Sequence, residues 1–255
     1  MPASVIPVTG LYLGFVGNIS NEGYSLRTAR QVNPTDTNSI AFGETFVLNT
    51  NNTYSSVKTF LTAGGLLIGS GVGRTPIGIA ASNVNINPAY NIQGSNDVLT
   101  PGGVYLPGSI MDGLVQGTIN VSCNNGSPSA GGNVYIRTAY DSAIPAGVVG
   151  GLEAVADPNT ITTTGATTGS STALTLGSGA GVVPGMAVSG TNVVPGSYIV
   201  SVVGTAAVLS TASSGTVSGN VVLSYTVLYD DFRWKTGFLE TDLTAQVTIL
   251  SRTIA

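Results

Sequence analysis

Residues 158–229 contain no Asp, Glu, Lys or Arg, so the 8 basic and 12 acidic side chains of the 255-residue chain all lie before or after this stretch. The stretch consists mainly of Thr, Ser, Gly, Ala and Val, and its apolar residues alternate with others in short runs, as in Leu174–Leu176 and Tyr198–Val202. Alternation with a period of two, between Gly and Pro residues, is typical of β-strands. We therefore predict that residues 160–226 form a separate, charge-free β module of about four to six strands.

A short motif is repeated inside this module. The sequence Val-Val-Pro-Gly occurs at Val182–Gly185 and again at Val193–Gly196. Pro and Gly suit the two central positions of a type II turn, because Pro has a fixed negative φ and Gly accepts a positive φ. The repeat therefore predicts two tight turns that belong to a small repeated hairpin element.

The sequences on both sides of the module show the same alternation, which indicates one β domain that the module interrupts. This discontinuous domain comprises residues 1–159 and 227–255. Its strand-like segments are 41–48, 77–81, 118–123, 134–138 and 244–251. Residues 124–126, Asn-Asn-Gly, tolerate positive φ and predict a hairpin in which 134–138 returns alongside 118–123.

Only one segment has the spacing of a helix. Ser55 can serve as its N-cap, the apolar residues Val57, Phe60 and Leu61 follow at helical spacing, and the glycines at 64–65 can end it after about ten residues. Gly and Pro interrupt the rest of the chain every few residues. We therefore predict an all-β fold: a jelly-roll or β-sandwich-like domain, interrupted by the small all-β module, with at most one or two short helices.

The composition excludes several classes of function. The chain has no His, the commonest general base and zinc ligand, and its single Cys, Cys123, has neither a disulfide partner nor a His to activate it. We interpret Cys123 as a small core residue. The net charge of −4 does not provide the cations that nucleic-acid binding requires. No uninterrupted run of about 18 apolar residues could cross a membrane as a helix. We expect no metal, no cofactor, no nucleic acid and no membrane partner.

An enzyme that uses two carboxylates, such as one that degrades polysaccharides, would not need His. The carboxylate pairs that lie close in the sequence are Asp230 with Asp231, Glu153 with Asp157, and Glu240 with Asp242. Adjacent residues in a strand point to opposite faces, so the first pair would not converge. We interpret all three pairs as solvated charges at the rim of the fold. The Gly-rich segment 69–74 lacks the glycine spacing and the Lys of a phosphate-binding loop, and we interpret it as a turn.

The flanking domain resembles the structural cement (capsid decoration) proteins of tailed bacteriophages. Short strand motifs with Gly or Pro at their turns carry the resemblance through their order and spacing, over most of residues 10–157 and 230–255. These motifs are Asn18–Asn21 leading to Arg30, Ile40–Gly43, Val47–Leu48, Ile77–Ala81, Tyr105–Gly108, Gly117–Val121, Gly132–Arg137, Gly151–Ala154 and Phe232–Arg252. The charge-free module is a departure from the short family pattern.

The resemblance implies a virion structural protein on the capsid exterior, which binds the outer surface of the assembled phage capsid and stabilises contacts between major capsid protein subunits. It implies the major capsid protein as a partner and self-association as a homodimer or homotrimer. It implies neither catalysis nor a cofactor. The uncharged module at 160–226 would project outward, and we add the hypothesis that it binds host-surface glycans weakly.

Two sets of residues are candidates for contact with the capsid. Residues 1–12 form an N-terminal arm that is too apolar to remain free in water and that could add a strand to a neighbouring subunit. The apolar residues of this arm are Val5, Ile6, Val8, Leu11 and Tyr12. Arg27 and Arg30 form the only basic pair before the middle of the chain and could face an acidic partner surface.

Two other functions remain open from the sequence. A tail-fibre or receptor-binding adhesin that recognises host-surface glycans would favour aromatic residues clustered for stacking on sugars. Here Tyr and Phe are dispersed, and Trp234 is the only Trp. A polysaccharide-degrading enzyme would depend on carboxylates such as Asp230 or Glu153.

Overall fold

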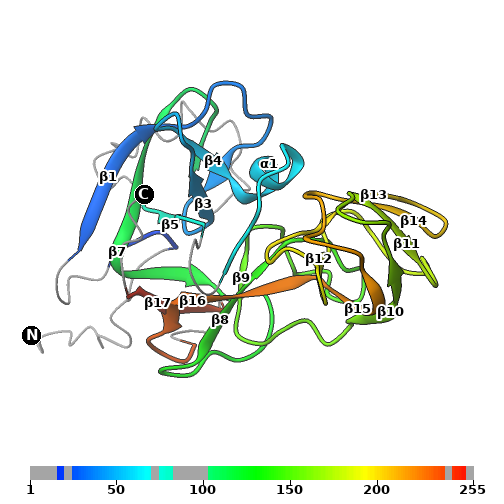
Figure 1. Cartoon of the computed structure of the whole chain (residues 1–255). Helices are drawn as coiled ribbons and strands as arrows, with labels where there is room; N and C mark the ends of the chain where they lie inside the picture. Colours follow the sequence, from blue (N-terminus) through cyan, green and yellow to red (C-terminus); the bar gives the residue numbers. More distant parts are fainter. Residues whose placement is uncertain (1–15, 20–24, 70–74, 83–102, 239–242, 251–255) are drawn as a thin grey trace, which may run out of the picture.

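The computed structural model describes residues 16–19, 25–69, 75–82, 103–238 and 243–250 of the chain. Strands make up 45% of the structure and helix 3%. The strands form a nine-stranded sheet, a six-stranded sheet and a two-stranded ladder (Figure 1). The predicted all-β, sandwich-like class is therefore confirmed, and the described residues contain one short helix.

The nine-stranded sheet is antiparallel throughout. Its strands follow the order β4 (Tyr54–Ser56), β3 (Thr45–Leu48), β5 (Ile77–Ala80), β7 (Ile110–Ser122), β17 (Thr244–Ile249), β16 (Thr226–Trp234), β8 (Asn133–Arg137) and β9 (Leu152–Glu153). The ninth strand, β1 (Leu26–Gln31), lies outside this path and pairs with β7. We call the described residues before 160 and after 226, which include this sheet and helix α1 (Val57–Thr62), the body.

The long strand β7 belongs to both halves of the sheet. Its residues 110–116 pair with β1, whereas residues 117–122 pair with β17. Gly117 lies where the partner changes, and its φ of +123° is a conformation that favours Gly because a side chain would be strained there. The sheet is curled, and β7 connects two halves of it. The first half contains β1, β3, β4 and β5, and the second contains β8, β9, β16 and β17.

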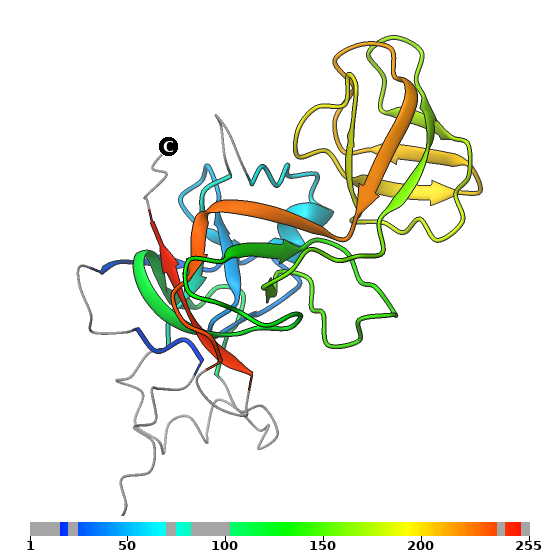
Figure 2. The same ribbon diagram turned by 90° about the horizontal axis from the view of Figure 1, so that it is seen from below.

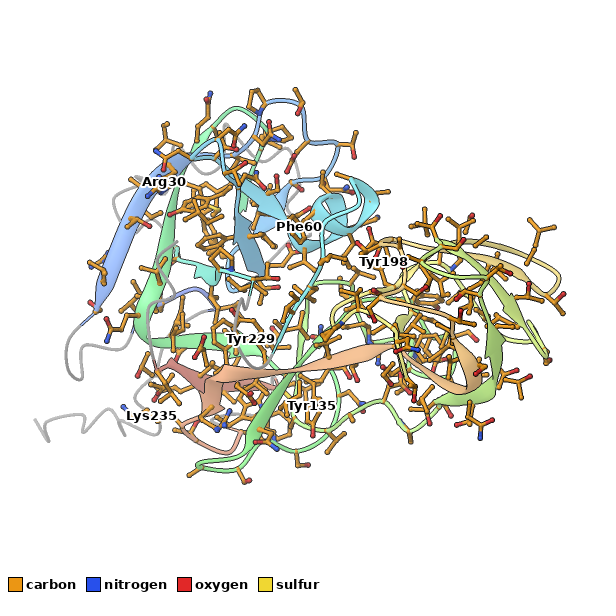
Figure 3. All side chains as sticks on the ribbon, viewed as in Figure 1. Arg30, Phe60, Tyr135, Tyr198, Tyr229 and Lys235 are labelled. Atoms are coloured by element: carbon orange, nitrogen blue, oxygen red, sulfur yellow. The ribbon has the colours of Figure 1, made fainter. Side chains whose placement is uncertain are left out.

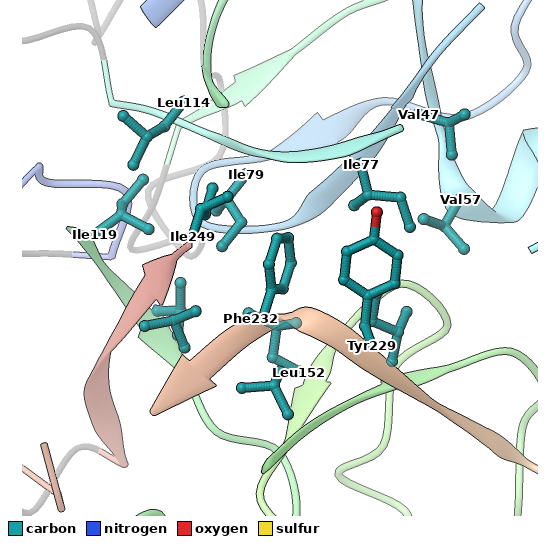
Figure 4. Close-up of a cluster of buried hydrophobic side chains, with 14 of the residues drawn as sticks. Val47, Val57, Ile77, Ile79, Leu114, Ile119, Leu152, Tyr229, Phe232 and Ile249 are labelled. Carbon is teal, nitrogen blue, oxygen red and sulfur yellow. The ribbon is translucent and has the colours of Figure 1, made fainter. Parts of the chain in front are cut away.

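The core of the body receives side chains from both halves of the curled sheet. Ile79 and Leu114 come from the first half, and Phe232 and Ile249 come from the second (Figure 4). All four are at most 2% exposed. Burial of apolar side chains stabilises a fold by about 25 cal/mol per Å² removed from water, so this shared core holds the two halves together.

Helix α1 begins one residue later than the sequence analysis indicated. Ser56, and not Ser55, is the N-cap, because the Ser56 hydroxyl accepts a hydrogen bond from the Thr59 backbone N–H at 3.1 Å. Ser55 instead donates to the Asp36 carboxylate at 3.0 Å. Gly64 follows the helix with a φ of +89°, as expected for a terminating Gly. Within the described ranges, no helix is long and apolar enough to span a membrane.

The predicted single strand over 41–48 is wrong in its first half. Strand β2 (Ile40–Ala41) ends at Ala41, where it pairs with β6 (Val104–Tyr105), and a turn precedes β3. The Glu44 carboxylate stabilises this turn by accepting a hydrogen bond from the Ala41 backbone N–H at 2.8 Å. Gly43 has a φ of +74°, which suits the turn and not an extended strand.

The predicted hairpin between 118–123 and 134–138 is also wrong, although both segments are strands. β17 and β16 lie between β7 and β8 in the sheet, so these two strands are not neighbours. Gly126 does have a positive φ of +79°, and the turn exists. The C-terminal strand β17 takes the place beside β7 that the local prediction assigned to β8, because pairing along a sheet is decided by distant segments.

The six-stranded sheet is formed entirely by residues 161–224. Its order is β12 (Ala187–Gly190), β15 (Ser218–Ser224), β10 (Ile161–Ala166), β11 (Ala173–Leu176), β14 (Ala206–Leu209) and β13 (Ile199–Val203). Its core cluster is distinct from that of the body and contains Leu174, Leu176, Val221 and Leu223. We propose to treat residues 160–226 as a module, and Figure 2 shows it as a lobe to which β16 runs from the body.

Both Val-Val-Pro-Gly repeats form the predicted tight turns. Gly185 and Gly196 have φ values of +92° and +82°, which is the conformation that a type II turn requires of its Gly. The Met186 backbone N–H donates to the Val183 carbonyl at 3.4 Å, and the Ser197 backbone N–H donates to the Val194 carbonyl at 3.0 Å. The repeat therefore produces the same turn twice.

Candidate functional site

Strand β1 carries the two arginines that the sequence analysis selected. Arg27 is exposed and Arg30 is half-buried, in a strand where exposed and half-buried residues alternate. Residues three apart in a strand point to opposite faces, so the structure does not bring the two guanidinium groups together. Arg30 instead interacts with Tyr54: burial raises the pKa of the Tyr54 hydroxyl, while hydrogen bonds with Thr28 and Arg30 and the charge of Arg30 oppose the rise.

β1 lies at an edge of the sheet. Among the described residues it pairs with β7 on one side and with no strand on the other. The backbone N–H and C=O groups along such an edge are available to a strand from another chain. The N-terminal arm, which the sequence analysis proposed as such a strand, lies outside the described residues with Val5, Ile6, Val8, Leu11 and Tyr12.

A segment with exposed apolar side chains adjoins the end of β1. Val104, Leu106 and Ile110 are 44%, 58% and 66% exposed. Ile110 pairs with Gln31, the last residue of β1, and the Gln31 amide donates to the Gly108 carbonyl at 2.9 Å. Exposed apolar side chains gathered near one another mark contact sites for other proteins. We call the outer edge of β1 together with Val104, Leu106 and Ile110 the β1 contact surface.

The sequence analysis did not identify this patch. It noted Tyr105–Gly108 only as a motif of the family resemblance. The sequence signal for this patch was the group of apolar residues around Pro107 and Gly108. Pro-Gly predicts a turn at the surface, and apolar side chains next to such a turn can remain exposed. Whether another segment covers such residues is decided only in the folded chain.

The interpretation of Glu153 and Asp157 as solvated rim charges is wrong. Both are buried with Arg137, and all three are at most 1% exposed. The Arg137 guanidinium donates through Nε to one Glu153 oxygen and through Nη2 to the other at 3.1 Å. The same Nη2 lies 2.9 Å from Asp157 Oδ2. We call these three residues the buried ionic cluster.

Electrostatics explains why these charges tolerate burial. Burial by itself would lower the pKa of Arg137, but hydrogen bonds to Glu153 and Asp157 and their negative charges outweigh it and raise that pKa. The Asn125 amide also donates to Glu153 at 3.3 Å. A buried charge that is paired and hydrogen-bonded avoids most of the cost of leaving water. The cluster is therefore a structural ion network.

Of the carboxylates considered for catalysis, the two pairs that lie within the described residues are not arranged as accessible pairs. Glu153 and Asp157 bind Arg137 and are closed to a polysaccharide. Asp230 is half-buried and Asp231 is buried, and both lie within β16 and not in a turn. Glu240 and Asp242 lie outside the described residues.

Two further positions from the sequence analysis can be placed. Cys123 is 2% exposed within the core of the body, as interpreted, and burial raises the pKa of its thiol. Of the Gly-rich segment 69–74, only Gly69 is described, and its carbonyl accepts a hydrogen bond from the Asp230 backbone N–H at 2.8 Å. Among the described residues, no group of three or more Cys, Asp or Glu side chains is placed to hold a metal ion.

Comparison with known proteins identifies the family. A model of phage proteins, described as structural cement protein, matches residues 8–184. The match includes β1, the β1 contact surface and the buried ionic cluster, and it ends at residue 184, after β10 and β11 of the six-stranded sheet. It does not include residues 230–255, which the sequence analysis counted in the resemblance. No curated protein matches the chain significantly. Because the match covers well over half of the sequence and agrees with the observed all-β fold, the chain belongs to the phage structural cement protein family.

Proposed function

We propose that this protein binds the outer surface of the assembled phage capsid and stabilises contacts between major capsid protein subunits. Family membership supports a structural role in the virion. The observation that carries the proposal on this chain is the β1 contact surface, in which a sheet edge with no further strand among the described residues adjoins the segment that carries Val104, Leu106 and Ile110. A sheet edge and an apolar patch are the two features by which one protein adds to another without charge pairing.

The thermodynamic role of such a protein follows from linkage. A protein that binds the assembled lattice but not the free subunit stabilises the lattice by RT ln(1 + [L]/Kd) for each site. Copies repeated around a shell multiply this effect. We propose self-association as a homodimer or homotrimer on the shell, with the N-terminal arm lying on a neighbouring subunit, and the module projecting outward.

The test uses capsids that lack this protein. Wild-type protein should sediment with them, and a variant with both Leu106→Asp and Ile110→Asp should lose at least about tenfold in affinity, because two charges would be buried at the contact. The matched control is Val203→Asp on the module, where the side chain is 81% exposed. Equal binding by the double variant and the wild type would overturn the assignment of this surface.

A second experiment tests the N-terminal arm. Deletion of residues 1–10 should abolish capsid attachment while the circular dichroism spectrum and melting temperature of the free protein stay those of the full chain. Unchanged attachment of the deletion variant would show that the arm does not contact the capsid. Deletion of residues 160–226 should leave attachment intact, because the module is proposed to face away from the shell.

The adhesin alternative gains no support from the module. Its two aromatic residues, Tyr198 and Tyr225, are 4% and 7% exposed. The exposed face of the six-stranded sheet therefore presents no aromatic ring for stacking on a sugar. Trp234 is buried in the body. The weak glycan binding that we considered for the module would have to rely on hydroxyl groups alone.

A further inference from the structure

We propose that the module is held on the body in one fixed orientation, and that Arg137, Glu153, Asp157, Tyr198 and the two Pro-Gly turns are the residues that position it. The proposal deepens the proposed function, because a module held in this way points in the same direction at every site on a shell. The proposal depends only on contacts within the free chain. A finding that the protein does not bind capsids would therefore not contradict the proposal.

The first contact holds the segment that leads into the module. Asp157 lies just before β10, and the Arg137 guanidinium ties it to the end of β8 and to β9. The Asp157 backbone N–H donates to the Thr226 hydroxyl at 3.1 Å. Thr226 begins β16, the strand by which the chain returns to the body. The two connections between module and body are thus joined to each other and to the buried ionic cluster.

A second set of hydrogen bonds reinforces the same place. The Asn159 amide donates to the Asp141 carboxylate at 2.7 Å, and the Asn159 backbone N–H donates to Asp157 at 2.9 Å. The Thr138 backbone N–H donates to the Tyr225 carbonyl at 2.8 Å. Segments before and after the module are therefore bonded to the loop that follows β8. A linker with this number of directional contacts has little freedom to bend.

The third contact is made by the module itself. Tyr198 lies just before β13, yet its ring packs in the core cluster of the body and is 4% exposed. Its hydroxyl donates to the Leu61 carbonyl near the end of α1. Figure 3 shows Tyr198 where the module meets α1. One aromatic side chain of the module is thus part of the body's interior.

The repeated Val-Val-Pro-Gly turns make the remaining contacts. A Cβ atom at Gly185 would lie 2.6 Å from the Thr138 carbonyl oxygen, and one at Gly196 would lie 2.7 Å from Ile68 Cγ1. Both distances are too short for real atoms, so both turns touch the body so closely that only Gly fits. The two copies of the motif contact the body at two separate places. Two contacts restrict the rotation of the module relative to the body as well as its position.

The ionic character of the cluster supports a positioning role. Buried ion pairs often contribute less to stability than well-packed apolar residues of the same size would, because desolvation offsets the attraction. Hydrogen bonds between ions have defined directions, however, whereas apolar contacts are not directional. Arg137, Glu153 and Asp157 therefore specify one geometry at the root of the module.

The free full-length protein provides the test, through residual dipolar couplings and ¹⁵N relaxation measured by NMR. In the wild type, the couplings of the body and the module should fit one common alignment tensor, and the two should tumble with one correlation time. Separate tensors or faster tumbling of the module in the wild type would overturn the proposal.

Two variants then identify the positioning residues. The triple variant Arg137→Met, Glu153→Leu and Asp157→Leu removes the cluster without leaving an unpaired charge, and it should give two alignment tensors while both sheets keep their native chemical shifts. The double variant Gly185→Ala and Gly196→Ala should do the same by pushing the turns off the body. A common tensor in either folded variant would contradict the role assigned to the residues that it changes.

The glycine variants have a matched control. Gly131 has a φ of +79°, close to that of Gly196, but a Cβ atom there would meet nothing within 4 Å. Gly131→Ala therefore carries a comparable backbone strain without a contact to disturb, and it should keep one tensor. If the triple variant fails to fold, the comparison of the Gly185→Ala, Gly196→Ala double variant with Gly131→Ala still tests the fixed orientation. These substitutions lie at the contact between module and body and not in the core.

Discussion

The guanidinium group of Arg137 donates to both carboxylate oxygens of Glu153 in a place where neither side chain has any exposed surface. Asp157 completes this cluster at Nη2, which also donates to Glu153, and it lies at the start of the segment that leads into the uncharged module. Charged side chains are scarce in this chain, and these three are at most 1% exposed. This arrangement leads to the first prediction.

Removal of one partner from the cluster should be costly. We expect Arg137→Met to lower the free energy of unfolding by about 3–5 kcal/mol, because two buried carboxylates lose their counter-ion. Denaturant unfolding followed by circular dichroism measures this. The control is Arg27→Met at an exposed position, with an expected change within about 0.5 kcal/mol. A loss below about 1 kcal/mol for Arg137→Met would show that the cluster is open to water.

The shared core of the curled sheet predicts a large effect at Phe232. Its side chain has no exposed surface, whereas Phe238, six positions later, is 38% exposed. We expect Phe232→Ala to cost about 3–5 kcal/mol through lost burial and the cavity that remains, and Phe238→Ala to cost under about 1 kcal/mol. Thermal and urea unfolding of the two variants provide the comparison. Similar losses at both positions would mean that the two halves do not share a core at Phe232.

The contact between Tyr198 and Leu61 predicts a measurable loss on removal of one oxygen atom. Tyr198→Phe removes one of the two donors to the buried Leu61 carbonyl, which keeps the hydrogen bond from the Gly64 backbone N–H, and we expect a cost of about 0.5–1.5 kcal/mol. Tyr140→Phe is the matched control, because Tyr140 is 58% exposed and can exchange its hydroxyl for water. Equal stability of the Tyr198→Phe variant and the wild type would indicate that this hydroxyl finds water in place of Leu61.

Glu44 predicts a pH dependence of stability. Burial raises the pKa of Glu44 to about 7 from an ordinary value of 4.5, against the opposing effects of the hydrogen bond from Ala41 and the charge of Lys58. A carboxyl group whose pKa is raised on folding stabilises the fold most while it is protonated, below its unfolded pKa. This contribution is lost as the pH rises through the folded pKa.

We therefore expect the free energy of unfolding to fall more steeply between about pH 4.5 and about pH 7 in the wild type than in Glu44→Gln. The difference should reach up to about 3 kcal/mol, since one pKa unit corresponds to about 1.4 kcal/mol. Gln keeps an oxygen that can accept from the Ala41 backbone N–H, so the turn before β3 is preserved. Urea unfolding across this pH range measures both proteins, and parallel curves would refute the role of Glu44.

Local features of the chain were predictable from the sequence. Leu174 and Leu176 alternate with exposed neighbours in β11 as their spacing indicates, and Pro-Gly at 184–185 and 195–196 forms the expected turns. These predictions succeed because alternation and turn formation depend on residues within a few positions of each other. The helix near residue 57 was predicted for the same reason, although its cap is Ser56.

The candidate sites were less predictable because they depend on segments far apart in the chain. Ile110 and Leu106 are exposed because no described segment of the folded chain covers them. Arg27 and Arg30 point to opposite faces because both lie in one strand, three residues apart. Glu153 and Asp157 looked like surface charges because charged residues usually are. Only the folded chain shows that Arg137 lies between them.

The sequence by itself determined that the chain is built of short strands and that residues 158–229 are free of charge, because these are properties of composition and of near neighbours. The tertiary structure alone decided that β17 lies between β7 and β16, that the charges just before residue 158 are buried, and that the two repeated turns stand against the body. The reason is physical: strand pairing, ion pairing and close packing are contacts between distant segments, whose geometry no local pattern contains.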